Sequence, residues 1–217
     1  MENADILSGL AKKETKAEDI AERVLKKPDL LPELFVGISS TNPRVMFGSA
    51  KILRTISEKD PNMLYSRIDF FENLLHSENN ILKWNAIDIV ANLTVADSLN
   101  KFDRFFSRFF GHLYEGSLIT ASHVVDNSGR IALAKPELQD KITQELLKVE
   151  EVPLPTEECR NILIGKTMKA FDAYYDKIKD KDKVISFVKR QLNNSRRATR
   201  AKAEKFLKKI EKQSMNI

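Results

Sequence analysis

The sequence contains one cysteine, Cys159, among its 217 residues. A single cysteine excludes an internal disulfide and any metal site built from several thiolates. A lone thiol becomes a nucleophile only in a setting that favours the thiolate, usually with a base close by. Cys159 instead opens an expected amphipathic helix and is followed by Arg160 and Asn161. We therefore expect a packed or idle thiol.

Glycine and proline are also scarce, with seven of each, which is too few for a sheet protein with many tight turns. No apolar run is long enough to cross a bilayer. Residues 1–27 mix Ile6, Leu7 and Leu10 with lysines, so the uninterrupted apolar stretch of a signal peptide is missing. With 42% apolar and 31% charged residues, the composition is that of a folded chain. We expect a cytoplasmic protein without membrane segments.

Patterns that would bind a metal or a nucleotide are incomplete. None of the three histidines, His76, His112 and His123, lies four residues from another or belongs to a metal-binding motif. The segment Gly165-Lys166-Thr167 matches the end of a phosphate-binding loop, but Arg160 stands where that loop needs a glycine. No strand precedes the segment, which lies inside a helical pattern. We therefore predict no metal, no cofactor, no small-molecule substrate and no catalytic residue.

What the chain does contain is apolar residues at helical spacing along most of its length, with no convincing period-2 alternation. A capping residue stands before a proline at Asn42-Pro43 and at Asp60-Pro61. Thr15 to Glu18 has the pattern of a capping box, and Pro136 and Thr156 are suited to open two more helices. Helix breaks are expected at Lys27-Pro28, Thr41-Asn42, Lys59-Asp60, Glu78-Asn79, Gly116-Ser117, Lys135-Pro136, Pro153 to Pro155 and Asn193-Asn194. The predicted fold class is all-α.

The breaks divide residues 29–213 into five pairs of helices, and the second helices of these pairs share a pattern. One position is always small: Ala50, Ala86, Ala121, Gly165 and Ala203. Three residues later the position is always large: Leu53, Ile89, Val124, Met168 and Phe206. Successive small residues are 36, 35, 44 and 38 positions apart, and the longest step includes the linker from Glu151 to Pro155. Small residues let neighbouring helices approach closely, and the large residues fill the layer beside them.

On these residues the chain resembles the HEAT-repeat family of ARM/HEAT-like α-solenoids. The matching segments are Asn42-Pro43-Arg44-Val45 before Ala50 and Leu53, Asn79-Asn80 with Trp84-Asn85-Ala86 before Ile89, and Asn193 to Arg197 before Ala203 and Phe206. The resemblance implies an α–α superhelix of about five helix pairs plus N-terminal helices. Residues 1–28 would be a helical cap and residues 29–217 the repeat array, within a single domain. In the third pair, Ser128-Gly129 is expected to break the second helix near Arg130.

Five phenylalanines follow one helical stripe: Phe102, Phe105, Phe106, Phe109 and Phe110. An aromatic face of this kind usually packs in the core. The alternative is a partly exposed groove for a partner helix.

Trp84 and Asp88 share a helix face at spacing i, i+4. In this spacing, and in its architecture, the chain resembles the bacterial DNA alkylation-repair glycosylases, which are HEAT-like and use tryptophans, an Asp and an Arg on a concave surface. The chain departs from them by having no second tryptophan. The competing interpretation is a Trp packed in the repeat core beside a surface Asp.

The basic end, Lys177 to Ile217, carries 14 Lys and Arg residues against four acidic ones, a net charge of +10 that leaves −5 for the rest of the chain. The candidate binding residues there are Lys189, Arg190, Arg196, Arg197 and Arg200, with Lys202, Lys205, Lys208, Lys209 and Lys212 following. Such an end could bind DNA, RNA or an acidic protein, or be the polar cap of a terminal repeat. No aromatic residue interleaves with the arginines to stack on bases.

The sequence therefore favours a non-catalytic α-solenoid scaffold that binds a protein partner, without an enzymatic activity. The alternative is a DNA-binding or base-excision protein on the same scaffold, with Trp84 and Asp88 at its site.

Overall fold

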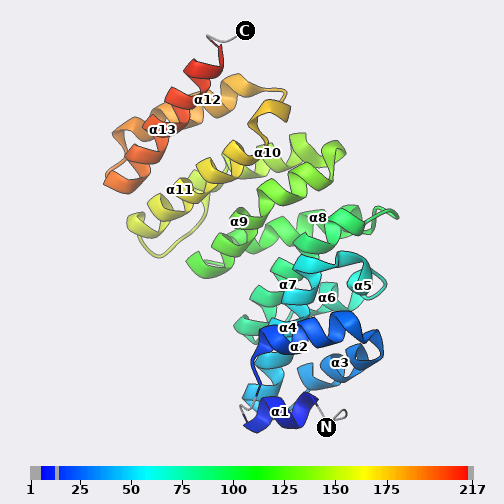
Figure 1. The fold of residues 1–217 in the computed structure, drawn as a ribbon. Coiled ribbons are helices and arrows are strands. Elements are labelled where there is room, and N and C mark those ends of the chain that lie inside the picture. Colours follow the sequence, from blue (N-terminus) through cyan, green and yellow to red (C-terminus); the bar gives the residue numbers. More distant parts are fainter. Residues whose placement is uncertain (1–5, 13–14, 215–217) are drawn as a thin grey trace. The chain divides into compact units, whose positions relative to one another are not determined.

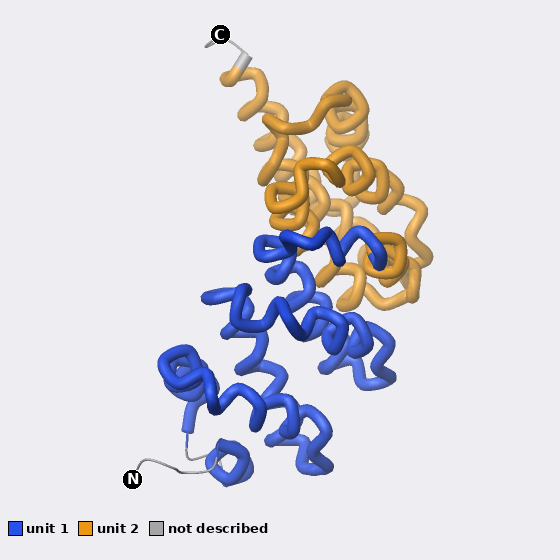
Figure 2. The backbone as a smooth tube through the Cα atoms, turned by 90° about the vertical axis from the view of Figure 1, so that its right-hand side faces the viewer, with its two compact units in different colours: residues 1–105 blue, residues 106–217 orange. Residues whose placement is uncertain are grey.

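The computed structural model describes residues 6–12 and 15–214, which form helices and no strands (Figure 1). This confirms the all-α fold class. The chain divides into two compact units, an N-terminal unit of residues 1–105 and a C-terminal unit of residues 106–217 (Figure 2). The expected division into a cap, 1–28, and an array, 29–217, is a different partition and stays a prediction.

The N-terminal unit holds seven α-helices among its described residues. They are α1 (Ile6–Lys12), α2 (Ala17–Lys26), α3 (Leu31–Ile38), α4 (Pro43–Lys59), α5 (Pro61–Tyr65), α6 (Ile68–Leu74) and α7 (Asn80–Leu93). Helix α4 is central, since it contacts α1, α2, α3, α5 and α7. Its side chains Ile52, Leu53 and Ile56 are fully buried.

Helix α8 (Lys101–Gly111) runs from one unit into the other. The C-terminal unit continues with α9 (Leu118–Ala134), α10 (Gln139–Leu147), α11 (Glu157–Tyr174), α12 (Lys181–Arg190) and α13 (Arg197–Ser214). Helix α11 contacts both α9 and α13. Short 3-10 segments flank the helices at Pro28–Leu30, Thr94–Ala96, His112–Tyr114, Pro136–Leu138, Val149–Glu151, Tyr175–Lys177 and Gln191–Asn193.

The eight expected breaks all separate helices. Two further breaks, between α7 and α8 and between α11 and α12, are not among the predicted ones, and with them the described helices after α2 follow one another as five pairs: α3 with α4, α5–α6 with α7, α8 with α9, α10 with α11, and α12 with α13. The first member of the second pair is itself split at Ser66-Arg67, where neither proline nor glycine marks a break. All five small and all five large positions of the aligned second helices are buried. The shared pattern therefore belongs to the packed interior, as predicted.

A side-chain cap opens four of the five second helices; before the fifth, α13, Asn194 Oδ1 accepts from Arg196 N in the loop that precedes the helix. Asn42 Oδ1 accepts a hydrogen bond from Arg44 N at 3.0 Å, and Asn79 Oδ1 accepts one from Ile81 N at 3.0 Å. Equivalent bonds are accepted by Ser117 Oγ from Thr120 N and by Thr156 Oγ1 from Cys159 N. These bonds satisfy backbone N–H groups that have no partner within the helix.

The predicted capping box is wrong. Helix α2 begins at Ala17, and its N-cap residue Lys16 makes no side-chain capping bond. The carboxylate of Glu18 lies 2.7 Å from Lys51 Nζ on α4 instead, and this hydrogen bond lowers the pKa of Glu18. An ion pair to the neighbouring helix thus replaces the local cap.

The predicted break at Ser128-Gly129 is also wrong, because α9 continues unbroken to Ala134. Ser128 Oγ donates to Val124 O at 2.8 Å, a bond within the helix. A Cβ on Gly129 would lie 2.9 Å from Ala173 Cβ and 3.1 Å from Ala170 O, both on α11. The glycine permits close packing of α9 on α11 and does not end the helix.

The phenylalanine stripe packs in the core, as expected, and leaves no exposed aromatic groove. All five rings are buried, with Phe102 on Phe105 in the N-terminal unit and Phe109 on Phe110 in the C-terminal unit at edge-to-face angles. None of the helices described is both long and apolar enough to span a membrane.

Candidate functional site: a basic cleft between α11 and α13

Trp84 and Asp88 lie on α7 in the N-terminal unit, and Trp84 is half-buried. The Asp88 side chain is 15% exposed, and its Oδ2 lies 3.4 Å from Arg54 Nη1 on α4. Arg54 Nε lies 3.8 Å from Glu58 Oε1. The structure thus adds Arg54 to the predicted pair. Its signal in the sequence is its place directly after Leu53, the large position of the first aligned helix.

Lys189 and Arg190 are both exposed, but only Arg190 forms an ion pair with a described residue. Arg190 Nη2 lies 2.6 Å from Glu150 Oε2 in the 3-10 segment before α11, and its guanidinium carbon lies 5.7 Å from the centre of the Phe187 ring. Lys189 forms no ion pair with any residue that the structure describes. These two neighbours in sequence therefore differ in their availability to a partner.

The three arginines before and at the start of α13 likewise differ in their contacts. Arg196 Nε lies 2.7 Å from Glu158 Oε1 on α11. Arg200 Nη1 donates to the carbonyl of Ser195 at 2.9 Å and also to that of Asn194. Its guanidinium group therefore stabilises the loop before the helix. Arg197 is exposed and has no ion pair within the described part of the chain. The predicted arginine cluster is thus not a single binding surface.

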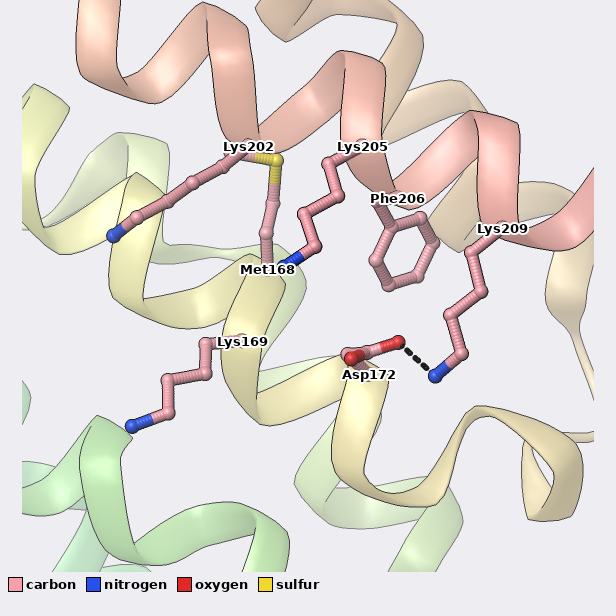
Figure 3. A pocket seen from close by; sticks show the side chains of 7 residues that line it. All are labelled: Met168, Lys169, Asp172, Lys202, Lys205, Phe206 and Lys209. Carbon is pink, nitrogen blue, oxygen red and sulfur yellow. Dashed lines mark hydrogen bonds and ion pairs between the residues drawn. The ribbon is translucent and has the colours of Figure 1, made fainter.

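A cleft of about 370 Å³ lies between α11 and α13, entirely within the C-terminal unit (Figure 3). We call it the basic cleft, and it is lined by Met168, Lys169, Asp172, Lys202, Lys205, Phe206 and Lys209. Met168 and Phe206, the large positions of the last two aligned helices, are 1% and 5% exposed. They form a buried apolar base, and the lysine side chains extend from the helices around it.

The four lysines of the basic cleft differ in the contacts that they make. Lys209 Nζ lies 2.5 Å from Asp172 Oδ1 across the cleft, and Lys202 Nζ donates to Gly165 O at 3.1 Å. Lys169 and Lys205 are exposed and make no ion pair with a described carboxylate. Lys205 reaches from α13 toward Met168 (Figure 3). The lining of the cleft therefore holds one carboxylate and four ammonium groups.

The pKa of Lys202 is affected by its burial and by the positive charges around it. Burial lowers the pKa of Lys202, and the nearby cations Arg196, Lys166 and Lys169 lower it further, against the opposing effect of Asp126. A neighbouring anion would favour the charged form of this lysine. The cleft is therefore suited to a negatively charged ligand.

Sequence reasoning found the lysines of α13 but missed the α11 wall of the cleft, Met168, Lys169 and Asp172. The signal was present in the repeat alignment. Met168 and Phe206 occupy the same aligned position, so residues next to them on successive helices come together. Lys169 follows the first of these residues, and Lys205 precedes the second.

The other segments with a chemical signature have structural contacts. Lys166 pairs with Asp126 on α9, and Thr167 Oγ1 donates to Leu163 O at 3.1 Å within α11, so Gly165-Lys166-Thr167 forms no phosphate loop. Cys159 is half-buried at the first turn of α11. Across residues 6–12 and 15–214, no group of three His, Cys, Asp or Glu side chains could hold a metal ion.

Comparison with known proteins gives a likeness of fold. No protein-family model matches the chain, and no curated protein matches it. Among solved structures, the chain is similar to the crystal structure of an engineered protein, with a TM-score of 0.56 and 14% sequence identity. The match covers 96% of this chain and 88% of the engineered one. At that identity the likeness concerns the fold alone.

Proposed function

We propose that the chain is a HEAT-type α-solenoid that acts in the cytoplasm as a non-catalytic scaffold for a protein partner. The observation that supports this proposal most is the burial of all ten aligned small and large positions. Successive second helices also contact each other within each unit, α4 with α7 and α11 with both α9 and α13. Helix pairs of this kind bury their apolar faces against the next pair and leave an extended surface for binding.

The surface of the second helices is suited to binding. The basic cleft opens between two such helices, and two of its lysines have no carboxylate partner among the described residues. Packed helices hold the backbone positions of these lysines in place, so only their side chains have to be ordered when a partner binds. A cleft lined by cations and apolar groups recognises charge and shape without a reacting group.

Affinity capture from native cell extract, at low and at high salt and with nuclease present, tests the scaffold. We expect a defined protein partner whose retention falls as the salt concentration rises, because charged contacts are screened. Recovery of nucleic acid alone, lost on nuclease treatment, would contradict the proposal.

A second function is favoured by one observation: Arg54 lies against Asp88 on the helix that also carries Trp84. A Trp, an Asp and an Arg on facing helices are the residue types that the DNA alkylation-repair glycosylases use. The alternative proposal is therefore DNA binding with release of an alkylated base. The chain offers no second tryptophan to complete the aromatic wall.

This alternative has its own test. Duplex DNA containing an alkylated base is incubated with the protein, and the released base is quantified by chromatography. Asp88→Asn would abolish release if Asp88 acts on the base, while circular dichroism checks that the variant is folded. Failure of the wild-type protein to bind duplex DNA at low salt would exclude this function.

A further inference from the structure

We propose that the basic cleft binds an acidic peptide segment that carries a large apolar side chain, presented by a partner protein. The inference rests on the proposed scaffold function and names the chemistry of the partner at one surface. The supporting observation is the lining of the cleft between α11 and α13, which combines unpaired ammonium groups with an apolar base.

Charge complementarity defines the first half of the ligand. Lys169 on α11 and Lys205 on α13 make no ion pair with a described residue. Each can therefore donate hydrogen bonds to a ligand carboxylate without losing an existing ion pair. Lys202 gains further, because its charged form is disfavoured by burial and by three neighbouring cations. A ligand carboxylate near Lys202 would offset the repulsion that Lys169 and the other neighbouring cations exert on it.

The apolar part of the cleft defines the second half. Phe206 packs edge-to-face on Tyr175, with ring centres 5.4 Å apart, which leaves it 5% exposed at the base of the cleft. Above it, the methylene stems of Lys205 and Lys209 line the walls (Figure 3). Lysine stems cover apolar surface while their ammonium groups stay in water, so an apolar ligand side chain can pack between them.

The length of the surface sets the size of the ligand. A second hollow on α13 is lined by Lys205, Lys208, Lys209, Lys212 and Gln213, so the cationic surface continues beyond the basic cleft. From Lys202 to Lys212 the helix rises roughly 15 Å at 1.5 Å per residue. An extended segment covers that length with about five residues, at roughly 3.3 Å each.

The contacts favour a peptide over a nucleic-acid backbone. A phosphate backbone provides regular negative charge but no apolar group to enter the cleft. Arginine is the side chain suited to bidentate phosphate contacts, and here Arg190 and Arg196 are paired with Glu150 and Glu158 while Arg200 holds loop carbonyls. Arg197 is exposed but does not line the cleft, so the available cations in the cleft are lysines.

The test measures fluorescence anisotropy of a fluorescein-labelled ten-residue peptide in which four acidic residues flank a central phenylalanine. Two matched probes replace that phenylalanine by serine or the acidic residues by lysine, and a fluorescein-labelled DNA duplex is the fourth probe. We expect the acidic phenylalanine peptide to bind, with at least fivefold weaker binding for the serine peptide and none for the lysine peptide.

Variants of exposed lysines locate the binding. The double variant Lys169→Glu and Lys205→Glu should weaken binding of the acidic phenylalanine peptide at least tenfold, because both groups then repel it. Two single-site controls carry the same change at exposed lysines outside the cleft: Lys189→Glu and Lys141→Glu, each expected to change affinity less than threefold. Circular dichroism checks folding, and Phe206 is left intact because it is part of the core.

Four outcomes overturn the inference. The acidic phenylalanine peptide does not bind, or the serine peptide binds equally well. Alternatively, the duplex binds more tightly than the peptide in a way that depends on Lys169 and Lys205, or the double variant and the controls lose the same affinity for the peptide. The scaffold function is judged separately by affinity capture with the same variants. A protein partner retained by the double variant would refute the peptide site and leave the scaffold proposal standing.

Discussion

Capping residues show how much one side chain contributes to this fold. The segments Ser40-Thr41-Asn42 and Ser77-Glu78-Asn79 form the same local structure. In each, the serine Oγ accepts from the backbone N–H of the asparagine at 3.1 Å, and the asparagine caps the next helix. These bonds involve residues two apart, so they could be predicted from sequence. The failure of the capping box predicted at Thr15 could not be foreseen in this way, since Glu18 pairs with Lys51 on another helix.

Asn79→Ala should lower the free energy of unfolding by about 1 kcal/mol, because Ile81 N and Leu82 N lose their acceptor at the start of α7. Urea denaturation measures the change. Asn80→Ala is the matched control, since Asn80 is the exposed first residue of the same helix and makes no side-chain hydrogen bond in the described structure. Equal losses in the two variants would show that the cap contributes nothing specific.

Tyr174 should titrate only at strongly alkaline pH. Burial raises the pKa of Tyr174 to about 12, against a smaller lowering by its hydrogen bond with Thr143 Oγ1, 3.0 Å away. The folded state therefore holds this proton more tightly than the unfolded chain, whose tyrosine pKa is about 10. The free energy of unfolding is unaffected below about pH 10 and falls above it, by up to roughly 3 kcal/mol beyond pH 12.

Absorbance at the tyrosinate band, followed against pH in the wild type and in Tyr174→Phe, isolates this phenol. The difference curve should show no ionisation until the pH exceeds about 11. An ionisation near the ordinary tyrosine pKa in the folded protein would contradict the burial of Tyr174 against α10.

At the scale of the helices, the close approach of two helices determines which residue type fits at some positions, even where that residue has a poor helix propensity. Gly129 lies in mid-helix, where glycine is usually unfavourable, yet α11 leaves no room there for a Cβ. The local rule that Ser-Gly marks a break fails here because the reason for the glycine is on a different helix. Gly165 has a similar place, with Thr199 Oγ1 3.1 Å from where its Cβ would be.

Gly129→Ala should destabilise the protein by roughly 1–3 kcal/mol, because overlap with Ala173 and the Ala170 carbonyl outweighs the better helix propensity of alanine. Gly111→Ala is the control. Gly111 is helical at the end of α8, and no atom lies within 4 Å of an added Cβ, so alanine should be neutral or stabilising by up to about 1 kcal/mol. Thermal unfolding of both variants tests the pair, and stabilisation by Gly129→Ala would contradict the close packing.

Ion pairs link neighbouring helices within each unit. In the N-terminal unit Lys51 pairs with Glu18 and Arg54 with Asp88, and in the C-terminal unit Lys166 pairs with Asp126 and Lys209 with Asp172. Exposed pairs of this kind contribute little free energy. They give several cations a carboxylate neighbour, whereas Lys169 and Lys205 in the basic cleft have none among the described residues.

At the scale of the whole molecule, the proposed solenoid predicts that stability accumulates pair by pair. Removal of residues 180–217, which contain α12 and α13, should leave a folded helical protein with a lower melting temperature and a smaller dependence of stability on urea. Circular dichroism during urea denaturation measures both. Complete loss of cooperative unfolding would indicate a single shared core and contradict a repeat array.

The sequence by itself determined most of the helices and of the breaks between them, most of their caps and the buried small and large positions, because each depends on residues a few places apart. Burial of the phenylalanine stripe follows for the same reason. Only the tertiary structure decided which cations are free. Glu150 and Glu158, which precede their partners by 40 and 38 residues, engage Arg190 and Arg196, while α11 brings Lys169 to the same cleft as Lys205. Charge acts through space, so a cluster in sequence becomes a site only where packing leaves its members unpaired.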